Sequence, residues 1–123
     1  MNSRAKGKRG ELEAAKALSE VLRVGVERTV QYSGAAGDAD LCIEALPMLH
    51  IEVKRRRCNI TPHQAEDFLT QAEADARPGK VPIVIHRADG DSGWCITVRL
   101  SRLYDLVSML CRHVHWLGVL PGR

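Results

Sequence analysis

Apolar and polar positions alternate in two neighbouring runs near the middle of the chain, residues 40–45 and 48–54, which are joined by Leu46-Pro47. Alternation with a period of two is typical of β-strands, because successive side chains point to opposite faces of a sheet. The two runs therefore predict a β-hairpin. In its second strand one face carries the apolar residues Leu49, Ile51 and Val53, and the other carries His50, Glu52 and Lys54.

The rest of the chain predicts further helices and strands around this hairpin. Apolar residues at helical spacing predict helices over residues 7–23, 62–77 and 101–117, with Thr61 and Ser101 as N-terminal caps. Apolar runs predict strands over residues 26–32, 81–86 and 94–99, and the run 81–86 has the continuous apolar character of a strand buried on both faces. We expect one α/β domain over residues 1–123, with residues 1–6 as a mobile basic arm. The last helix is expected to pack on the sheet and to leave part of its apolar stripe for a dimer contact.

Pairing of the two central strands would gather acidic and basic side chains on one patch. If their apolar sides lie together, Asp40 comes opposite or diagonal to Glu52 and Lys54. Mg²⁺ prefers oxygen ligands and needs only one or two carboxylates beside a substrate phosphate. We therefore expect Asp40 and Glu52 to bind a divalent cation, with the Val53 carbonyl as a third oxygen. The Lys54 ammonium would orient the attacking water and offset charge on the phosphate.

Each of these features has a simpler interpretation when it is taken alone. A Glu-x-Lys pair on a strand is commonly a solvated ion pair, and Glu11 could simply complement the dipole of the first helix. The small-residue loop over residues 33–37 could be an ordinary turn, or its backbone could approach a phosphate closely. Asp38 and Asp40 both follow that loop as possible ligands. What favours a functional site is the combination of these features in one chain.

Charge and composition point to a polyanionic partner inside the cell. The 123-residue chain carries a net charge of +3, and arginine forks suit phosphate groups. The four cysteines form no C-x-x-C pair, and neither a signal peptide nor a long apolar run is present, so we expect a reducing intracellular compartment and no membrane partner. The basic residues expected to contact a DNA backbone are Arg4, Lys6, Lys8, Arg9, Arg28, Arg55, Arg56 and Arg57.

Taken in order, these motifs resemble those of the PD-(D/E)xK nuclease superfamily, and within it those of the archaeal-type Holliday junction resolvases. The resemblance covers about residues 6–99, and the order and spacing of the motifs carry it together. The matching segments are Lys6-Gly7 with Glu11, the Gly/Ser loop and Asp over residues 33–41, the Ile-Glu-x-Lys strand over 51–54, the helix start at 63–66, and the runs 81–85 and 93–94.

The resemblance implies a restriction-endonuclease-like core, with a mixed five-stranded sheet flanked by helices and an extra C-terminal helix. It implies Mg²⁺-dependent cleavage of four-way DNA junctions by a homodimer in recombination and repair, with Mn²⁺ able to substitute and no small-molecule cofactor. It favours Asp40 over Asp38 as the ligand, because Asp40 directly precedes an apolar strand residue. It adds Glu11 to the metal-binding acids, and it implies that Ser33 assists at the scissile phosphate.

Three other functions remain compatible with the sequence. Another nuclease of the superfamily could cut linear or flapped DNA, since shared motifs do not fix the substrate. A catalytically silent DNA-binding module would keep the basic surface, although it has no need for acids among phosphate-binding charges. An interaction protein that uses the C-terminal helix would show no metal-dependent activity.

Overall fold

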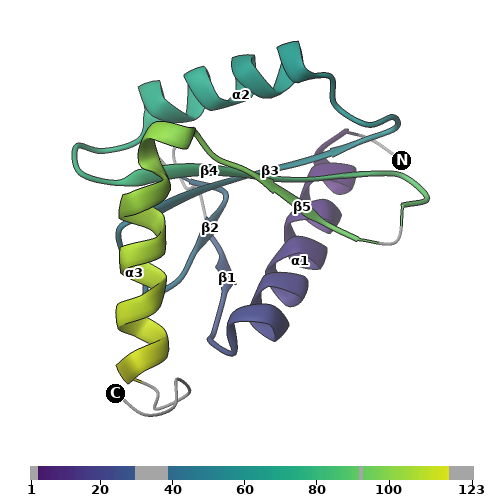
Figure 1. Ribbon diagram of the computed structural model, residues 1–123. Helices are drawn as coiled ribbons and strands as arrows, with labels where there is room; N and C mark the ends of the chain where they lie inside the picture. Colours follow the sequence, from purple (N-terminus) through teal and green to yellow (C-terminus); the bar gives the residue numbers. More distant parts are fainter. Residues whose placement is uncertain (1–2, 30–38, 92, 117–123) are drawn as a thin grey trace.

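The computed structural model describes residues 3–29, 39–91 and 93–116, and it has an α/β architecture (Figure 1). In this part of the chain, none of the helices is long and apolar enough to span a membrane. The elements in order are α1 (Ser3–Leu22), β1 (Glu27–Arg28), β2 (Leu41–Cys42), β3 (Leu49–Arg56), α2 (Pro62–Asp75), β4 (Val81–Ala88), β5 (Cys95–Thr97), the 3₁₀ turn η1 (Leu100–Arg102) and α3 (Leu103–Trp116).

The five strands form one mixed sheet in the order β1-β2-β3-β4-β5. Only β3 and β4 are parallel, and α2 connects them, as a parallel pair requires a crossover. The other neighbouring strands pair antiparallel. The predicted α/β class, the mixed five-stranded sheet and the C-terminal helix are therefore confirmed. The sheet is centred on β3 and β4, which are eight residues long and largely buried.

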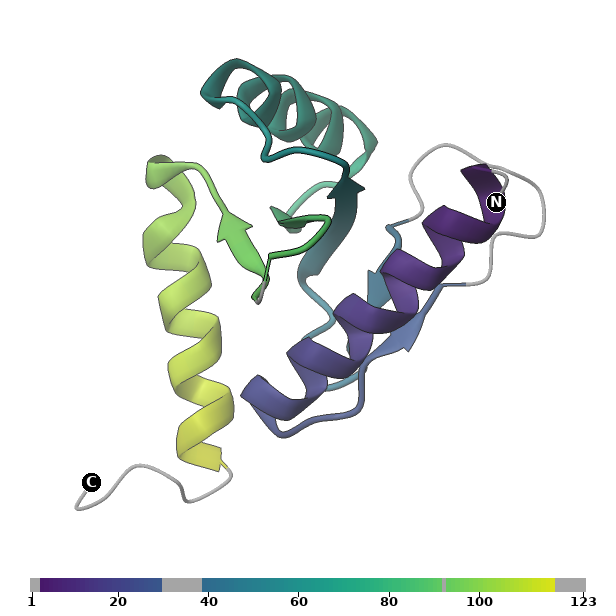
Figure 2. The same cartoon turned by 90° about the vertical axis from the view of Figure 1, so that its right-hand side faces the viewer.

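Helices cover both faces of the sheet. Helices α1 and α3 lie on one face and α2 lies on the other (Figures 1 and 2). The larger part of the core lies on the α1 and α3 side, where Leu41, Ile51 and Ile83 are almost completely buried. On the opposite side α2 buries Leu69 and Ala72. Each strand residue of β3 therefore faces either α1 or α2, according to its place in the alternation.

A close approach of α1 to β3 depends on a glycine. Gly10 is buried in α1, and a Cβ atom at this position would lie 3.2 Å from the Cβ of Arg55 in β3. That separation is shorter than ordinary carbon contacts, so a side chain at position 10 would have to push the helix away from the sheet. The glycine thus sets how closely the amino-terminal half of α1 packs on β3.

Several element boundaries differ from the sequence-based prediction. Helix α1 begins at Ser3, so residues 3–6 belong to the helix instead of to a basic arm, and Lys6 is anchored by an ion pair with Asp89 at 3.3 Å. Strand β2 ends at Cys42, because a turn with a hydrogen bond from the Leu46 amide to the Ile43 carbonyl follows it. Most of the predicted strand over residues 26–32 beyond β1 lies outside the described residues.

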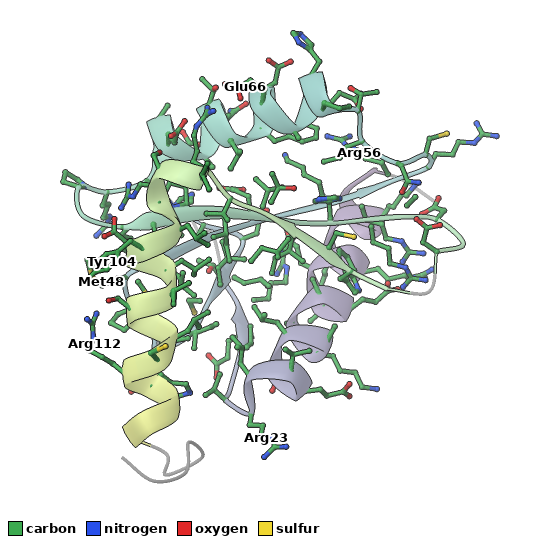
Figure 3. All side chains as sticks on the ribbon, viewed as in Figure 1. Arg23, Met48, Arg56, Glu66, Tyr104 and Arg112 are labelled. Carbon is green, nitrogen blue, oxygen red and sulfur yellow. The ribbon has the colours of Figure 1, made fainter. Side chains whose placement is uncertain are left out.

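Of the two predicted N-terminal helix caps, one is present in the structure and the other is not. Thr61 caps α2 as predicted, and it forms a capping box with Gln64. Ser101 does not cap α3, because it lies inside η1, for which Arg99 is the capping residue. Of the predicted stripe on α3, Leu106 packs inward, whereas Leu103 and Val107 are exposed. Tyr104 also points outward from this helix (Figure 3).

We predict that Gly10→Leu lowers the free energy of unfolding by about 1–3 kcal/mol, because the added side chain overpacks the contact between α1 and β3. Gly7 offers a matched control in the same helix, since an added Cβ there meets nothing within 4 Å. Gly7→Leu should leave stability unchanged or slightly raised through its better helix propensity. Urea unfolding followed by circular dichroism measures both, and equal stability of the two variants would contradict the close approach.

Candidate metal and active site

Pairing of β2 with β3 brings two carboxylates to one point of the sheet. Leu41 pairs with Ile51, so Asp40, one residue before Leu41, lies opposite Glu52, one residue after Ile51. The hairpin pattern predicted this juxtaposition, and the register confirms it. Both carboxyl groups are partly buried. Their proximity follows directly from the apolar faces of the two strands being buried together.

The backbone holds Asp40 firmly in this position. Its amide donates a hydrogen bond to the Ile51 carbonyl at 2.9 Å, and its carbonyl accepts one from the Thr29 amide at 2.9 Å. The side chain also takes part, because Oδ2 accepts a hydrogen bond from the Val53 amide at 2.8 Å. Asp40 therefore has a fixed backbone and a fixed carboxyl group, which is what a preorganised ligand needs.

Electrostatics within the pair favour a shared proton. The pKa of Asp40 is raised to about 7, and burial is the main cause. The hydrogen bond from the Val53 amide lowers this pKa, whereas the charge of Glu52 and a hydrogen bond with Glu52 raise it further. Burial also acts to raise the pKa of Glu52, but hydrogen bonds from His50 and Asp40 outweigh it, so that this pKa is lowered. Two acids that cannot both ionise freely form a site where a divalent cation would relieve the repulsion.

Glu52 has a second partner that sequence reasoning placed on the same face without giving it a role. His50 is 1% exposed, and its Nε2 lies 2.8 Å from Glu52 Oε1. Among the described residues it is the one polar side chain that is fully buried. A histidine two residues before the Glu on the same strand is the signal that could have identified it.

The lysine of the Glu-x-Lys strand is positioned by an aromatic ring of α2. Lys54 Nζ lies 4.9 Å from the ring centroid of Phe68, and the Arg56 guanidinium lies 5.2 Å from the same ring. Cation–π contacts of this kind hold an ammonium without neutralising it. Figure 3 shows Arg56 near the end of β3, below the start of α2. The sequence contains one phenylalanine, but nothing in its pattern indicated this contact.

The other two predicted metal ligands, Glu11 and the Val53 carbonyl, differ in how well they are placed to bind a cation. Glu11 of α1 is close enough for its charge to add to the raised pKa of Asp40, but its carboxylate accepts a hydrogen bond from Arg28 Nε. In the described ranges, no three His, Cys, Asp or Glu side chains gather around a single metal position. The Val53 carbonyl fits better, because the amide and carbonyl of one strand residue point to the same edge, and the Val53 amide points to Asp40. Asp40, Glu52 and the Val53 carbonyl are thus the oxygens best placed for a cation.

The basic residues divide between two environments. Arg55 lies on the α1 side of β3, where it binds Glu13 at 2.6 Å and Asp89 at 3.1 Å, so its guanidinium is engaged within the protein. Arg28 is likewise paired with Glu11. The other described members of the predicted DNA-contacting set are exposed, and they are Lys8, Arg9, Arg56, Arg57 and Lys6, of which Lys6 also pairs with Asp89. Ser33 and Asp38 lie outside the described residues, as does the side chain of Arg4.

Fold and site together define a PD-(D/E)xK-type nuclease domain, in which an Asp and a Glu-x-Lys strand meet across one register of the sheet. Comparison with known families supports this class: residues 2–116 match the model of the family described as phage putative PDDEXK endonuclease. The chain belongs to this family. No curated protein and no solved structure matches it.

We predict that the metal-free protein loses stability as the pH rises through about 7, the value to which burial raises the pKa of Asp40. A pKa raised in the folded state means that this state binds the proton more tightly. The contribution of Asp40 to stability is therefore complete below the unfolded pKa of about 4, is lost as the pH rises to about 7, and is constant above it. Asp40→Asn should be more stable than the wild type at pH 8 by about 2 kcal/mol, and this advantage should vanish at pH 4.

Urea unfolding in EDTA at several pH values measures this difference. Glu20→Gln removes an exposed carboxylate of α1 and serves as the matched control, which should follow the wild type at every pH. A difference between Asp40→Asn and wild type that stays constant with pH would contradict the raised pKa.

Proposed function

We propose that this protein is a metal-dependent DNA endonuclease, with Asp40, Glu52 and Lys54 as its central catalytic residues. The observation that carries the proposal is the register of β2 on β3, which sets Asp40 opposite Glu52, while Lys54 projects from the same face of β3. Membership of a PDDEXK endonuclease family supports a nuclease at this position.

The donor set fits Mg²⁺, with Mn²⁺ as a substitute. Asp40 and Glu52 would supply carboxylate oxygens and Val53 a carbonyl oxygen, all of which are hard ligands that Mg²⁺ prefers. The raised pKa of Asp40, caused first by burial and then by Glu52, supports this assignment because a cation would replace the shared proton. When bound, the cation would lower the pKa of a coordinated water and polarise the scissile phosphate. Glu11 would add negative charge at the edge of this site while Arg28 restrains it.

Lys54 would act on the water and the phosphate. Its ammonium is held against Phe68, on the face of β3 that carries Glu52. A fixed positive charge at this point can orient the attacking water and stabilise the charge that develops on the phosphate oxygens. We propose that Ser33 assists at the scissile phosphate, on the basis of the motif resemblance alone.

The finer proposal concerns the substrate. We propose four-way DNA junctions cut by a homodimer, because the order and spacing of the motifs over residues 6–99 are similar to those of archaeal-type Holliday junction resolvases. The exposed basic residues of α1 and of the segment after β3 would contact the phosphate backbone. Cleavage of linear or flapped DNA is the competing activity, and family membership is equally consistent with it.

We predict that the wild type cuts a labelled four-way junction in Mg²⁺ and makes no cut in EDTA. Glu52→Gln and Lys54→Met should each lower the cleavage rate by at least about 10²-fold, because they remove a ligand and a transition-state charge. Both should still bind the junction in an electrophoretic shift assay. Glu20→Gln is the matched control, and it should cut like the wild type.

The same assay separates the alternatives. Paired cuts across the junction, with a matched linear duplex left intact, would support a resolvase. Equal cutting of the duplex would support a general endonuclease and reject the finer proposal. Binding without cutting in Mg²⁺ or Mn²⁺ would reject an enzyme altogether.

We predict that Arg57→Gln and Arg55→Gln affect different properties, DNA binding in the first variant and stability in the second. Arg57 is exposed, so its loss should weaken DNA binding and reduce the salt slope of binding by about 1. Arg55 is engaged by Glu13 and Asp89, so its loss should lower the free energy of unfolding by about 1 kcal/mol and change the salt slope little. Fluorescence anisotropy at several salt concentrations and urea unfolding measure the two effects. A reduced slope for Arg55→Gln alone would contradict this division.

A further inference from the structure

A buried histidine lies next to the proposed metal ligand and has no place in the mechanism so far. His50 lies in β3, where its strand neighbour is the buried Pro82 of β4, and its side chain is 1% exposed. Burial of an imidazole without a hydrogen bond is costly, and an apolar residue would fill such a place without that cost. The polar group at this position therefore needs a specific partner to explain it.

That partner is Glu52. The 2.8 Å contact joins His50 Nε2 to Glu52 Oε1, and the two residues project from the same face of β3 because they are two apart on one strand. A carboxylate that binds a cation is ionised and can only accept hydrogen bonds, so Nε2 must carry the hydrogen that is donated. The contact consequently engages one oxygen of Glu52 and leaves the other oxygen for the cation.

We propose that His50 is a positioning residue for the metal site: its Nε2–H holds Oε1 of Glu52, and thereby fixes the rotamer in which Glu52 binds a divalent cation opposite Asp40. This inference rests on the proposed metal site. Hydrogen bonds to ligating carboxylates restrict their motion, and loss of such partners typically weakens metal binding by about 10–100-fold. His50 therefore sets cation affinity without touching the cation, the water or the DNA.

Titration of the DNA-free protein with Mn²⁺ alone, followed by electron paramagnetic resonance of free Mn²⁺, tests this role directly. His50→Leu fills the buried position with an apolar side chain and removes the hydrogen-bond donor, so it should weaken Mn²⁺ binding by about 10–100-fold. His50→Gln places an amide donor at a distance similar to that of Nε2, and it should recover most of the affinity. Glu52→Gln should remove the site.

A control variant distinguishes positioning from general stability. Ile83→Val deletes one buried methylene on the opposite side of the sheet and should cost about 0.5–1.5 kcal/mol of stability. It should bind Mn²⁺ like the wild type, although it is less stable. If His50 had a structural role alone, His50→Leu would bind Mn²⁺ with wild-type affinity at temperatures where the variant is folded. That result would overturn the inference.

The remaining outcomes are equally decisive. If Glu52→Gln abolishes Mn²⁺ binding and His50→Leu does not weaken it, the metal site stands and the role of His50 is rejected. If the wild type binds no Mn²⁺, both the metal site and the role of His50 are rejected. Should His50→Leu fail to fold, ¹⁵N-histidine spectra of the wild type decide: the Nε2–H tautomer with a shift on addition of Mg²⁺ supports the inference, and the Nδ1–H tautomer overturns it.

Discussion

The antiparallel register of β2 on β3 is the constraint on which the site depends. Burial of Leu41 and Ile51 on one face fixes that register, and the same alternation then sets Asp40 opposite Glu52. A slip by one residue would turn either carboxylate to the wrong face, so the hydrophobic core and the acidic pair stabilise the same arrangement. The repulsion between the two acids is the local cost of this arrangement. The hydrogen bond from the Val53 amide offsets part of that cost in the metal-free protein.

Strand β3 serves two different purposes through its two faces. On the α2 side, His50 and Phe68 contact Glu52 and Lys54, so the proposed catalytic side chains are supported by buried or aromatic neighbours. On the α1 side the strand packs in the core, and at its end Arg55 is bound by acids of α1 and of the turn after β4. Consecutive residues of one basic run therefore differ in environment: Arg55 is engaged by acids of the protein, whereas Arg56 and Arg57 are exposed.

The sequence predicted the features that arise from local periodicity. The alternation in β3, the continuous apolar run of β4 and the cap at Thr61 each depend on neighbouring residues, and the facing of Asp40 and Glu52 follows from burial of the apolar faces. Long-range contacts were not predictable in this way. The ion pair of Lys6 in α1 joins it to Asp89 of a distant turn, and the engagement of Arg55 depends on Glu13 far along the chain. The contacts of His50 and Phe68 have no periodic signature, so only the folded arrangement identifies them.

The proposed cation site requires that Asp40 and Glu52, which face each other across the β2–β3 register, bind one ion together. Anomalous diffraction from crystals grown with Mn²⁺ tests this most directly, because it locates the ion without reference to activity. We expect an anomalous peak between the two carboxylates, within coordination distance of the Val53 carbonyl. Crystals that bind Mn²⁺ elsewhere, or that show these two carboxylates without an ion at saturating Mn²⁺, would contradict it.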